Sequence, residues 1–498
     1  MVGDLRLCPC FGSRGSEEPE MELDPVLLVS GMGGSILHSK RKKFGFETRV
    51  WVRILFSDLE FKKKLWSLYN PETGYTESLD DDIEILVPDD DYGLYAIDIL
   101  DPSWLVKLMH LTEVYHFHDM IDMLVGCGYK KGTTLFGYGY DFRQSNRIDK
   151  LMEGLKVKLE TAHKASGGRK VNIISHSMGG LLVLCFLSLH NDVFSKYVNK
   201  WITIACPFQG APGCVNDSLL TGLQFVEGFE AYFFVSRWTM HQLLVECPSV
   251  YEMLPNPDFS WKMQPQINVW REHSEDGETS VKLESYSPTE SIVLFNEALR
   301  HNELNYGGNT IALPFNISIL NWAAGTRKVI NNAKLPSGIC FYNIYGTSFD
   351  TPFDVCYGTE TSPIGDLSEI CHTMPQYTYV DGDGTVPAES AMTSLAVTGK
   401  SCLPLLSFSA LQFSSFILPH MKLYVIEAKH VKLSSVGYQL FEKADRFAAV
   451  ERAGVAASHR GLLCDKTVFK LIQKWLGVEQ KVTRKYSKTS KVADASSN

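Results

Sequence analysis

The sequence predicts an α/β fold, in which a mostly parallel sheet is covered by helices on both faces. Short, apolar and β-branched runs such as 26–29, 171–174 and 198–206 alternate with longer segments of helical periodicity. Glycine-rich turns follow two of the apolar runs directly. The chain has 498 residues, of which 45% are hydrophobic, so it can bury the large core that this class of fold needs.

The expected elements follow one another along the chain in the order that a parallel sheet requires. Strands are predicted at 26–29, 134–138, 171–174, 198–206, 339–345 and 377–380, and helices at 119–126, 148–163, 181–187 and 466–476. The alternation is lost between Asp217 and Thr326. This interruption indicates a cap or lid, at about 217–326, inserted into the core fold.

A serine turn follows the strand at 171–174. Residues 175–180 read Ser-His-Ser-Met-Gly-Gly, and a wholly apolar helix comes next. Strand, small-x-Ser-x-small turn and helix form the nucleophile elbow of an α/β-hydrolase fold, which predicts Ser177 as the nucleophile. The N–H of Met178, at the start of the helix, is then a candidate donor to an oxyanion. The alternative is an ordinary strand-turn-helix with Ser175 or Ser177 as a helix cap.

The first strand ends in a second glycine-rich turn, Ser-Gly-Met-Gly-Gly-Ser at residues 30–35. In α/β-hydrolases an early loop of this kind supplies the second oxyanion donor, so the N–H of Met32 is the candidate partner of Met178. A phosphate-binding loop and a plain turn are the alternatives. No Gly-Lys-Ser/Thr follows, which disfavours a nucleotide site.

An acidic loop follows the late apolar run at 377–380. Residues 380–387 read Val-Asp-Gly-Asp-Gly-Thr-Val-Pro, and a carboxylate here is placed to orient an imidazole. Asp383 fits best, because Thr-Val-Pro turns the chain away at once, and Asp381 is its competitor. A calcium loop is the structural alternative, but the remaining ligands of a twelve-residue EF-hand loop are missing.

The base of an α/β-hydrolase comes last in the chain order Ser, Asp, His. His420, His430 and His459 all follow Asp383. His459 stands immediately before the amphipathic final helix at 466–476, and the loop between the last strand and the last helix is where this fold carries its base. We therefore expect His459 to be the general base.

Composition narrows the class of protein. The formal net charge of −9 argues against a nucleic-acid partner. The first ten residues lack the apolar core of a secretory signal. Twelve cysteines without the close spacing of a metal site indicate reduced thiols. A cytoplasmic protein, soluble or peripherally associated with membranes, is expected.

With these segments in place, the chain resembles the lecithin:cholesterol acyltransferase family, most closely its plant, non-secreted branch of phospholipase A and acyltransferase-like proteins. The resemblance extends from about Asp24 to Leu476 and is carried by the motifs at 30–35, 140–143, 175–180, 207–212, 382–387 and 459–463. It implies Ser177, Asp383 and His459 as nucleophile, acid and base, and an oxyanion donor at Met32. It also implies a glycerophospholipid as acyl donor.

The sequence departs from the family pattern in two places. Secreted members carry a disulfide in an early lid loop, whereas this chain has no cysteine between Cys10 and Cys127. Residues 392–442 match nothing in the family and lie between Asp383 and His459. This segment is either a genuine insertion or the product of a splice or gene-model error. We expect a flexible segment at 1–22, a hydrolase domain at 23–477 and a disordered basic tail at 478–498.

The resulting functional expectation is a calcium-independent phospholipase A that works through an acyl-serine intermediate and releases free fatty acid and lysophospholipid. This chemistry requires neither a metal nor a cofactor. The alternatives are an acyltransferase that uses a sterol or diacylglycerol as acceptor and, from another class, a lipid-binding pseudoenzyme in which the segment 392–442 separates Asp383 from His459. No protein partner is inferred.

Contact with a phospholipid membrane is expected at 39–66. This stretch carries nine basic residues against Glu47, Asp58 and Glu60, interleaved with apolar side chains that include Trp51 and Trp66. A solvated charged loop over ordinary core residues is the alternative.

Three further features complete the expectations. The aromatic segment 225–251 is expected to line an acyl pocket or to form a plain packed helix. The acidic clusters at 80–82 and 89–91 are expected to be solvated turns rather than metal sites. Asp141 and Arg143 are expected to brace the site.

Overall fold

Six parallel strands form the centre of the molecule. The computed structural model describes residues 22–43, 45–53, 63–104, 108, 112–226, 236–275, 278–392 and 449–479. The central sheet has the order β17-β14-β9-β8-β1-β7, and every hydrogen-bonded pair in it is parallel. Its strands are β1 (Val26–Val29), β7 (Leu135–Tyr138), β8 (Val171–His176), β9 (Val198–Ile204), β14 (Cys340–Gly346) and β17 (Glu451–Val455). The predicted α/β class is confirmed.

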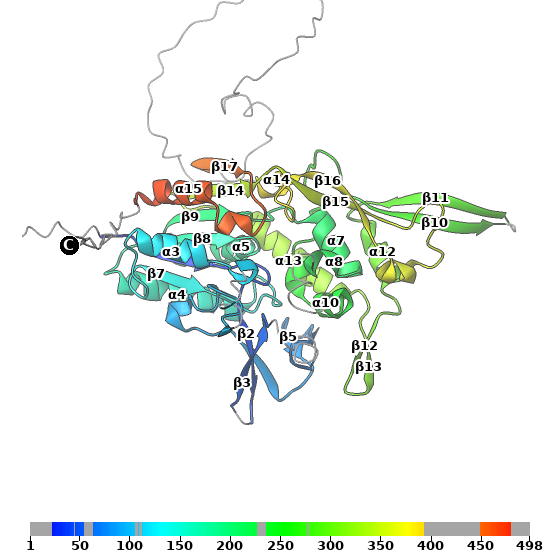
Figure 1. The fold of residues 1–498 in the computed structure, drawn as a ribbon, viewed down its shortest axis with the longest axis horizontal. Coiled ribbons are helices and arrows are strands. Elements are labelled where there is room, and N and C mark those ends of the chain that lie inside the picture. Colours follow the sequence, from blue (N-terminus) through cyan, green and yellow to red (C-terminus); the bar gives the residue numbers. More distant parts are fainter. Residues whose placement is uncertain are drawn as a thin grey trace, which may run out of the picture.

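Successive side chains of a strand point to opposite faces of the sheet, and in β1 all of them are apolar. Helices therefore cover both faces. Val26 and Leu28 of β1 belong to one hydrophobic core, which α3 (His118–Gly126) and α15 (Lys466–Leu476) complete. Leu27 and Val29 belong to the other core, with α4 (Asp149–Ala165), α5 (Gly179–Leu189) and α6 (Asn191–Tyr197). Figure 1 shows α4 on one side of the sheet and α3 and α15 on the other.

The final helix shows why its bounds could be predicted from the sequence. The side chain of Asp465 accepts hydrogen bonds from the backbone N–H groups of Thr467 and Val468, and so caps the start of α15. Gly477 ends the helix in the left-handed conformation, with φ 72°. Both signals are local, and α15 covers the residues that the sequence analysis predicts.

The prediction that residues 377–380 form a strand of the central sheet is wrong. These residues lie in β16 (Gln376–Gly382), which pairs antiparallel with β15 (Phe349–Tyr357) in a second sheet of order β11-β10-β15-β16. The position beside β14 is taken by β17. Much of β16 is exposed, as is common in antiparallel sheets, and an apolar run alone does not reveal its partner.

The region between β9 and β14 is where the strand-helix alternation is lost. It holds α7 (Pro212–Leu220), α8 (Leu223–Val226), α10 (Arg237–Leu244), α11 (Pro248–Tyr251), β10 (Ile267–Glu275), β11 (Glu278–Tyr286), α12 (Ser291–Ala298), β12 (Glu303–Tyr306), β13 (Asn309–Ala312) and α13 (Ile317–Asn332). The second sheet therefore combines two strands from this region, β10 and β11, with two from beyond it. Figure 1 shows the β10–β11 hairpin projecting from one end of the molecule.

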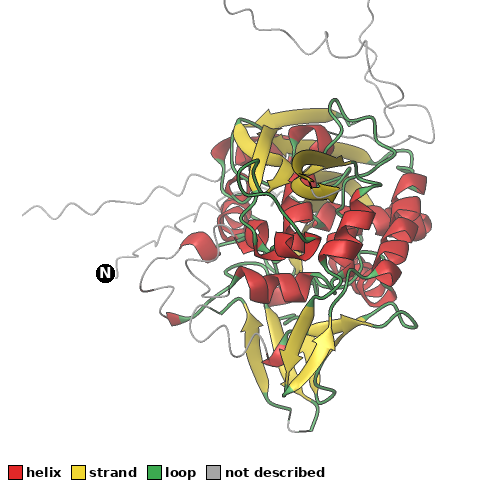
Figure 2. Cartoon of the chain, turned by 90° about the vertical axis from the view of Figure 1, so that its right-hand side faces the viewer, coloured by secondary structure: helices red, strands yellow, loops and turns green. Residues whose placement is uncertain are grey.

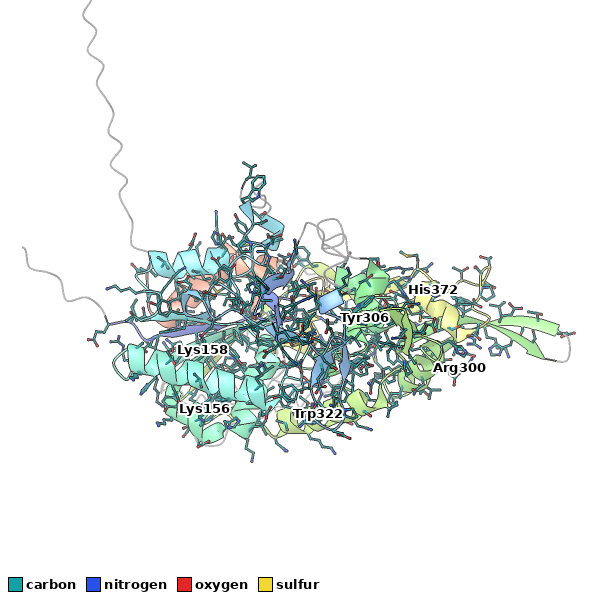
Figure 3. All side chains as sticks on the ribbon, turned by 90° about the horizontal axis from the view of Figure 1, so that it is seen from below. Lys156, Lys158, Arg300, Tyr306, Trp322 and His372 are labelled. Carbon is teal, nitrogen blue, oxygen red and sulfur yellow. The ribbon has the colours of Figure 1, made fainter. Side chains whose placement is uncertain are left out.

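A buried carboxylate joins this region to the loop between β7 and α4. Glu252, directly after α11, accepts hydrogen bonds from the Ser145 hydroxyl at 2.5 Å, the Asn146 backbone N–H at 2.9 Å and the Thr326 hydroxyl at 2.7 Å. Burial raises the pKa of Glu252. Beside it, the guanidinium carbon of Arg147 lies 3.8 Å from the ring centroid of Trp322, which is labelled in Figure 3. Residues from three distant parts of the chain thus meet at one buried point.

A small three-stranded sheet, β3-β2-β6, lies at the lower end of the molecule, and we call it the surface sheet. It consists of β2 (Leu37–Arg41), β3 (Glu47–Trp51) and β6 (Ile83–Leu86), with the hairpin β4 (Ser67–Tyr69) and β5 (Thr76–Ser78) nearby. Figure 2 shows strands gathered at this end, below the helices.

The surface sheet corrects part of the membrane prediction. Trp51 and Trp66 are buried, with 3% and 6% of their surface exposed, so they belong to the core. Phe46, at the turn between β2 and β3, is 74% exposed instead. The sequence alone does not show whether an aromatic side chain next to basic residues points into the core or into solvent.

Short elements complete the described chain. These are α14 (Ala388–Ala391) and the 3-10 turns η1 (Asp91–Gly93), η2 (Thr112–Val114), η3 (Leu367–His372) and η5 (Gly461–Leu463). Within the described ranges, no helix has the length and apolar character needed to cross a bilayer. The expected N-terminal segment up to residue 21, the segment 393–442 and the tail from 480 lie outside the described residues.

Candidate active site

Ser177 lies at the predicted nucleophile elbow, between β8 and α5. Its φ of +53° is in the left-handed region, which a non-glycine residue rarely adopts and which marks a strained turn. The turn leaves no space for larger neighbours. A Cβ added to Gly179 would lie 2.1 Å from the Ser30 carbonyl oxygen, and one added to Gly180 would lie 2.4 Å from Cys206 Sγ. The small residues of the motif are therefore a steric requirement.

Three side chains from distant segments form one hydrogen-bonded row. Ser177 Oγ lies 2.8 Å from His459 Nε2, and His459 Nδ1 lies 2.8 Å from Asp383 Oδ2. With the proton on Nδ1, the imidazole donates to the carboxylate and accepts from the serine hydroxyl. This arrangement lets the ring take the serine proton while the carboxylate stabilises the resulting imidazolium. Asp383 and His459 are 76 positions apart in the chain, yet their side chains meet.

The structure distinguishes Asp383 from its competitor Asp381. Asp383 is 1% exposed, and its second oxygen, Oδ1, accepts backbone N–H groups of Thr385 at 2.9 Å and Val386 at 2.7 Å. Both carboxylate oxygens are thereby fixed. Asp381 lies on the exposed side of β16, where its Oδ1 accepts the Ser348 N–H at 2.6 Å.

His459 is held by its backbone as well as by its ring. It lies in the loop between β17 and α15, as the sequence analysis expects, and its N–H donates to the Asp383 carbonyl oxygen at 2.8 Å. Its own carbonyl oxygen lies 3.0 Å from His176 Nε2, so His176 donates to it. The other two candidates, His420 and His430, lie outside the described residues.

The glycine loop, residues 30–35, lies directly against the nucleophile. A Cβ added to Gly31 would come within 2.7 Å of Ser177 Cβ. The Ser30 and Ser35 hydroxyls are 2.6 Å apart and hold the two ends of the loop together. In the part of the chain that the structure describes, the N–H groups of Met32 and Met178 have no protein acceptor. The two predicted donors are thus free and lie in segments adjacent to Ser177.

Two uncharged histidines lie near the base. Burial, together with the charge of Arg460, lowers the pKa of His116 to about 3, and burial also holds the pKa of His176 well below 6.5. The ring centroids of His176 and His459 are 4.8 Å apart, and those of His116 and His176 are 5.5 Å apart. At neutral pH the two buried histidines are uncharged, so they do not oppose a positive charge on the His459 ring.

Asp141 and Arg143, which the sequence analysis expects to brace the site, form an ion pair. Burial alone would raise the pKa of Asp141, but the Arg143 guanidinium outweighs it and lowers that pKa. The two groups form a bidentate pair at 2.8 and 2.9 Å, and Arg143 Nη1 also donates to the Leu65 carbonyl oxygen at 2.8 Å. The pair therefore connects the loop after β7 to the chain near the surface sheet.

The acidic cluster at 89–91 forms ion pairs. Asp89 contacts Lys158, labelled in Figure 3, and Asp91 Oδ2 lies 2.6 Å from Lys131 Nζ. Over the described ranges, no group of three or more His, Cys, Asp or Glu residues is arranged to hold a metal ion.

The predicted acyl pocket at 225–251 remains a prediction. Residues 227–235, with Phe229, Tyr232, Phe233 and Phe234, lie outside the described residues. In the described part, the Trp238 ring stacks on His241 at 4.8 Å between centroids, as in a packed helix.

Two contacts of the site were missed by the sequence analysis. His176 is adjacent to the nucleophile, but its bond to His459 crosses 283 positions of sequence. The indole N–H of Trp51 donates to the Gly33 carbonyl oxygen at 2.7 Å, and this contact also depends on tertiary structure. The only sequence signal for His176 is its place beside Ser177.

Comparison with known proteins identifies the same family that the sequence motifs resemble. Residues 55–395 match the family model described as lecithin:cholesterol acyltransferase. The chain is 65% identical to "Phospholipase A(1) LCAT3" of Arabidopsis thaliana over 492 residues, which covers 98% of this chain and 99% of the relative. It is 46% identical to "Lecithin-cholesterol acyltransferase-like 4" of the same plant over 468 residues, with 93% and 77% coverage.

A more distant similarity extends to animals. "Lysosomal phospholipase A and acyltransferase" of Homo sapiens is 23% identical over 336 residues, which covers 65% of this chain and 66% of the relative.

Proposed function

Because this chain belongs to the lecithin:cholesterol acyltransferase family, we propose that it is a serine phospholipase A that releases free fatty acid and lysophospholipid from glycerophospholipids. The observation that carries the proposal is the hydrogen-bonded row of Ser177, His459 and Asp383, with both contacts at 2.8 Å. The pseudoenzyme alternative requires that Asp383 and His459 be held apart, and their contact argues against it.

The first half of the reaction acylates the serine. Ser177 Oγ attacks the ester carbonyl carbon while its proton passes to His459 Nε2, and the carbonyl electron pair moves to the oxygen. The C–O bond to the glycerol then breaks. His459 gives the proton to the departing lysophospholipid alkoxide, which leaves an acyl-serine ester. Asp383 holds the ring through Nδ1 in both steps.

The N–H groups of Met32 and Met178 are the proposed oxyanion donors. Both are free of protein acceptors among the described residues, and both lie in segments that border Ser177. Loss of one donor of this kind typically costs about 3–4 kcal/mol of transition-state stabilisation.

The second half of the reaction hydrolyses the acyl-serine ester. His459 removes a proton from water, the hydroxide oxygen attacks the acyl carbon, and the Ser177 oxygen leaves with the proton from His459. We favour water as the acceptor and the sn-1 ester as the bond cleaved, because the Arabidopsis relative that is 65% identical is named phospholipase A(1). A lipid alcohol is the second candidate acceptor, because the human relative's name includes acyltransferase.

A phospholipid membrane is the proposed partner surface, contacted by the β2–β3 hairpin. Arg41, Lys64, Ser39, Thr48 and the exposed ring of Phe46 line a hollow of about 420 Å³ there. Basic groups beside an exposed aromatic ring suit anionic headgroups and the bilayer interface. The cysteines that the structure describes are free thiols, which supports a reducing, cytoplasmic location.

The activity is tested with vesicles of phosphatidylcholine that carries different labels on its two acyl chains. Wild-type protein should release mainly the sn-1 fatty acid, with or without EDTA, even when a sterol or diacylglycerol is supplied. Ser177→Ala should release none and should lose labelling by a fluorophosphonate, with an unchanged thermal unfolding temperature. Retained labelling of Ser177→Ala contradicts the nucleophile, strict calcium dependence contradicts the mechanism, and a dominant acyl ester product favours the transferase.

Membrane contact is tested separately by vesicle sedimentation. Burial of an aromatic side chain contributes about 1.5–3 kcal/mol, so Phe46→Glu should weaken binding to anionic vesicles by about tenfold or more. Leu283→Glu is the matched control, because Leu283 is a large apolar side chain, 48% exposed, on the β10–β11 hairpin. Equal effects of the two variants would contradict the assignment of the β2–β3 hairpin.

A further inference from the structure

The indole of Trp51 connects the surface sheet to the glycine loop beside the nucleophile. Trp51 is the last residue of β3, and its Nε1–H donates to the Gly33 carbonyl oxygen at 2.7 Å. Gly33 belongs to the glycine loop, which contains Met32 and lies against Ser177. We propose that Trp51 is a positioning residue of this reaction, which holds the glycine loop in the conformation that presents the Met32 N–H to the oxyanion. The proposal rests on the oxyanion role given to Met32 above.

The glycine loop needs such a restraint because its backbone is intrinsically free. Gly33 has φ +67°, a conformation that glycine adopts readily but does not favour over others. The Gly34 N–H donates to the Gly31 carbonyl oxygen at 3.1 Å, and the Ser30 and Ser35 hydroxyls hold the ends together. The carbonyl oxygen of Gly33 accepts the hydrogen bond from Trp51. Without that donor, a buried carbonyl would lose its partner. Rotation of the Gly33–Gly34 peptide to find another partner would break the bond from the Gly34 N–H to the Gly31 carbonyl oxygen, and the peptide group of that carbonyl includes the Met32 N–H.

The remaining walls of the loop limit motion but do not set its orientation. A Cβ added to Gly34 would lie 2.4 Å from His116 Nε2, and one added to Gly31 would meet Ser177 Cβ. These are contacts of shape alone. The bond from Trp51 is directional, and it joins the middle of the loop to β3.

Trp51 is itself rigidly held. It is 3% exposed, it pairs with Leu37 in the β2–β3 ladder, and its ring centroid lies 5.4 Å from that of Phe142. Phe142 adjoins Arg143, which binds the Leu65 carbonyl oxygen. β3 thus leads from the exposed Phe46 turn to the glycine loop, so the proposed membrane-contacting hairpin and the catalytic centre share one strand.

A simple packing role is the competing explanation, and Trp51→Phe separates the two because it keeps an aromatic ring and removes the N–H. The assay uses p-nitrophenyl butyrate, a soluble ester that needs no membrane. We expect kcat to fall about tenfold with KM unchanged, a smaller loss than the 10²–10³ that follows removal of a direct donor. Inhibition by 1-butaneboronic acid, whose serine adduct places an oxygen in the oxyanion position, should weaken by a similar factor.

Trp66→Phe is the matched control. Trp66 is also buried, and its Nε1–H donates to the Thr239 carbonyl oxygen at 3.3 Å, away from the glycine loop. It should keep kcat and boronic acid inhibition within about twofold of wild type. Binding to anionic vesicles should be unchanged in both variants.

Two results would overturn the proposal. One is wild-type kcat and wild-type boronic acid inhibition in Trp51→Phe. The other is an equal loss in Trp66→Phe, which would indicate general damage to packing. If Trp51→Phe folds poorly, incorporation of 3-benzothienylalanine at position 51 replaces the N–H with sulfur in a ring of nearly the same shape, with the same expected losses. The ester assay does not depend on phospholipid, so it tests the role of Trp51 even if the protein does not hydrolyse phospholipids. The vesicle assay tests the phospholipase proposal separately.

Discussion

His176 Nε2 lies 3.0 Å from the carbonyl oxygen of His459, so the residue that precedes the nucleophile holds the backbone of the base. The same backbone is held on its other side, where the His459 N–H donates to the Asp383 carbonyl oxygen at 2.8 Å. Among the described residues the other ring nitrogen of His176, Nδ1, has no hydrogen-bond partner, which fits a neutral ring with its proton on Nε2. Elbow, acid and base are therefore connected through the main chain of His459 as well as through the triad side chains.

Removal of the His176 donor should slow catalysis without affecting substrate binding. His176→Phe keeps an aromatic ring but leaves the His459 carbonyl unpaired, and a displaced imidazole transfers the proton less well. We expect kcat on a soluble ester to fall about tenfold with KM unchanged, whereas His176→Gln, which retains a donor, should recover part of the loss. Equal kcat values for His176→Phe and wild type would show that the bond does not position the base.

The two aspartates of the acidic loop should differ sharply in their effect on activity. Asp383→Asn keeps the shape of the carboxylate but favours the wrong tautomer of His459, a change that lowers kcat about 10⁴-fold in a serine triad. Asp381→Asn is the matched control, because Asp381 binds only the Ser348 N–H within the described contacts, and kcat should stay within about twofold. The measurement is kcat for both variants at one pH, and a reversed order would assign the acid to Asp381.

Acid should destabilise the protein partly through His116. Its pKa is about 3 in the folded state and 6.5 in a free side chain, so between these values the unfolded state binds the extra proton and stability falls as pH falls. From pH 7 to pH 5 this group alone should remove about 2 kcal/mol of the free energy of unfolding, at 1.36 kcal/mol per pKa unit.

The effect is read from urea unfolding of wild type and His116→Leu at the two pH values. Glu252, whose pKa is raised by burial, contributes in the opposite sense in both proteins, so only the difference between them reports on His116. The variant should lose about 2 kcal/mol less than wild type on acidification. The same loss in both proteins would contradict the assignment.

Deletion of residues 392–442, which joins Ala391 to Lys443, should leave esterase activity equal or higher. The bonds that hold Asp383 and His459 all come from described residues outside that segment. A longer connection between fixed ends costs only about 0.6 kcal/mol per doubling of loop length. Soluble yield and kcat of the deletion variant are the measurements, and loss of folding or activity would mean that the segment is integral to the domain.

Sequence by itself determined the elements whose signals are local. The elbow at Ser177 could be recognised because a strand, a strained turn and a helix require small residues at fixed spacing, and Gly179 has no room for a side chain. The bounds of α15 followed from a cap at Asp465 and a left-handed stop at Gly477. His459 could be chosen by its place before that helix, since chain order and the final helix are both visible in the sequence.

Only the tertiary structure decided which groups meet across long distances. Asp383 and Asp381 are both next to glycine in the sequence, and burial against the Thr385 and Val386 amides distinguishes them. The partner of β16 and the burial of Trp51 were decided in the same way. Periodicity describes how one segment alternates, but strand pairing and side-chain burial depend on what packs against that segment, and here the partners come from remote parts of the chain.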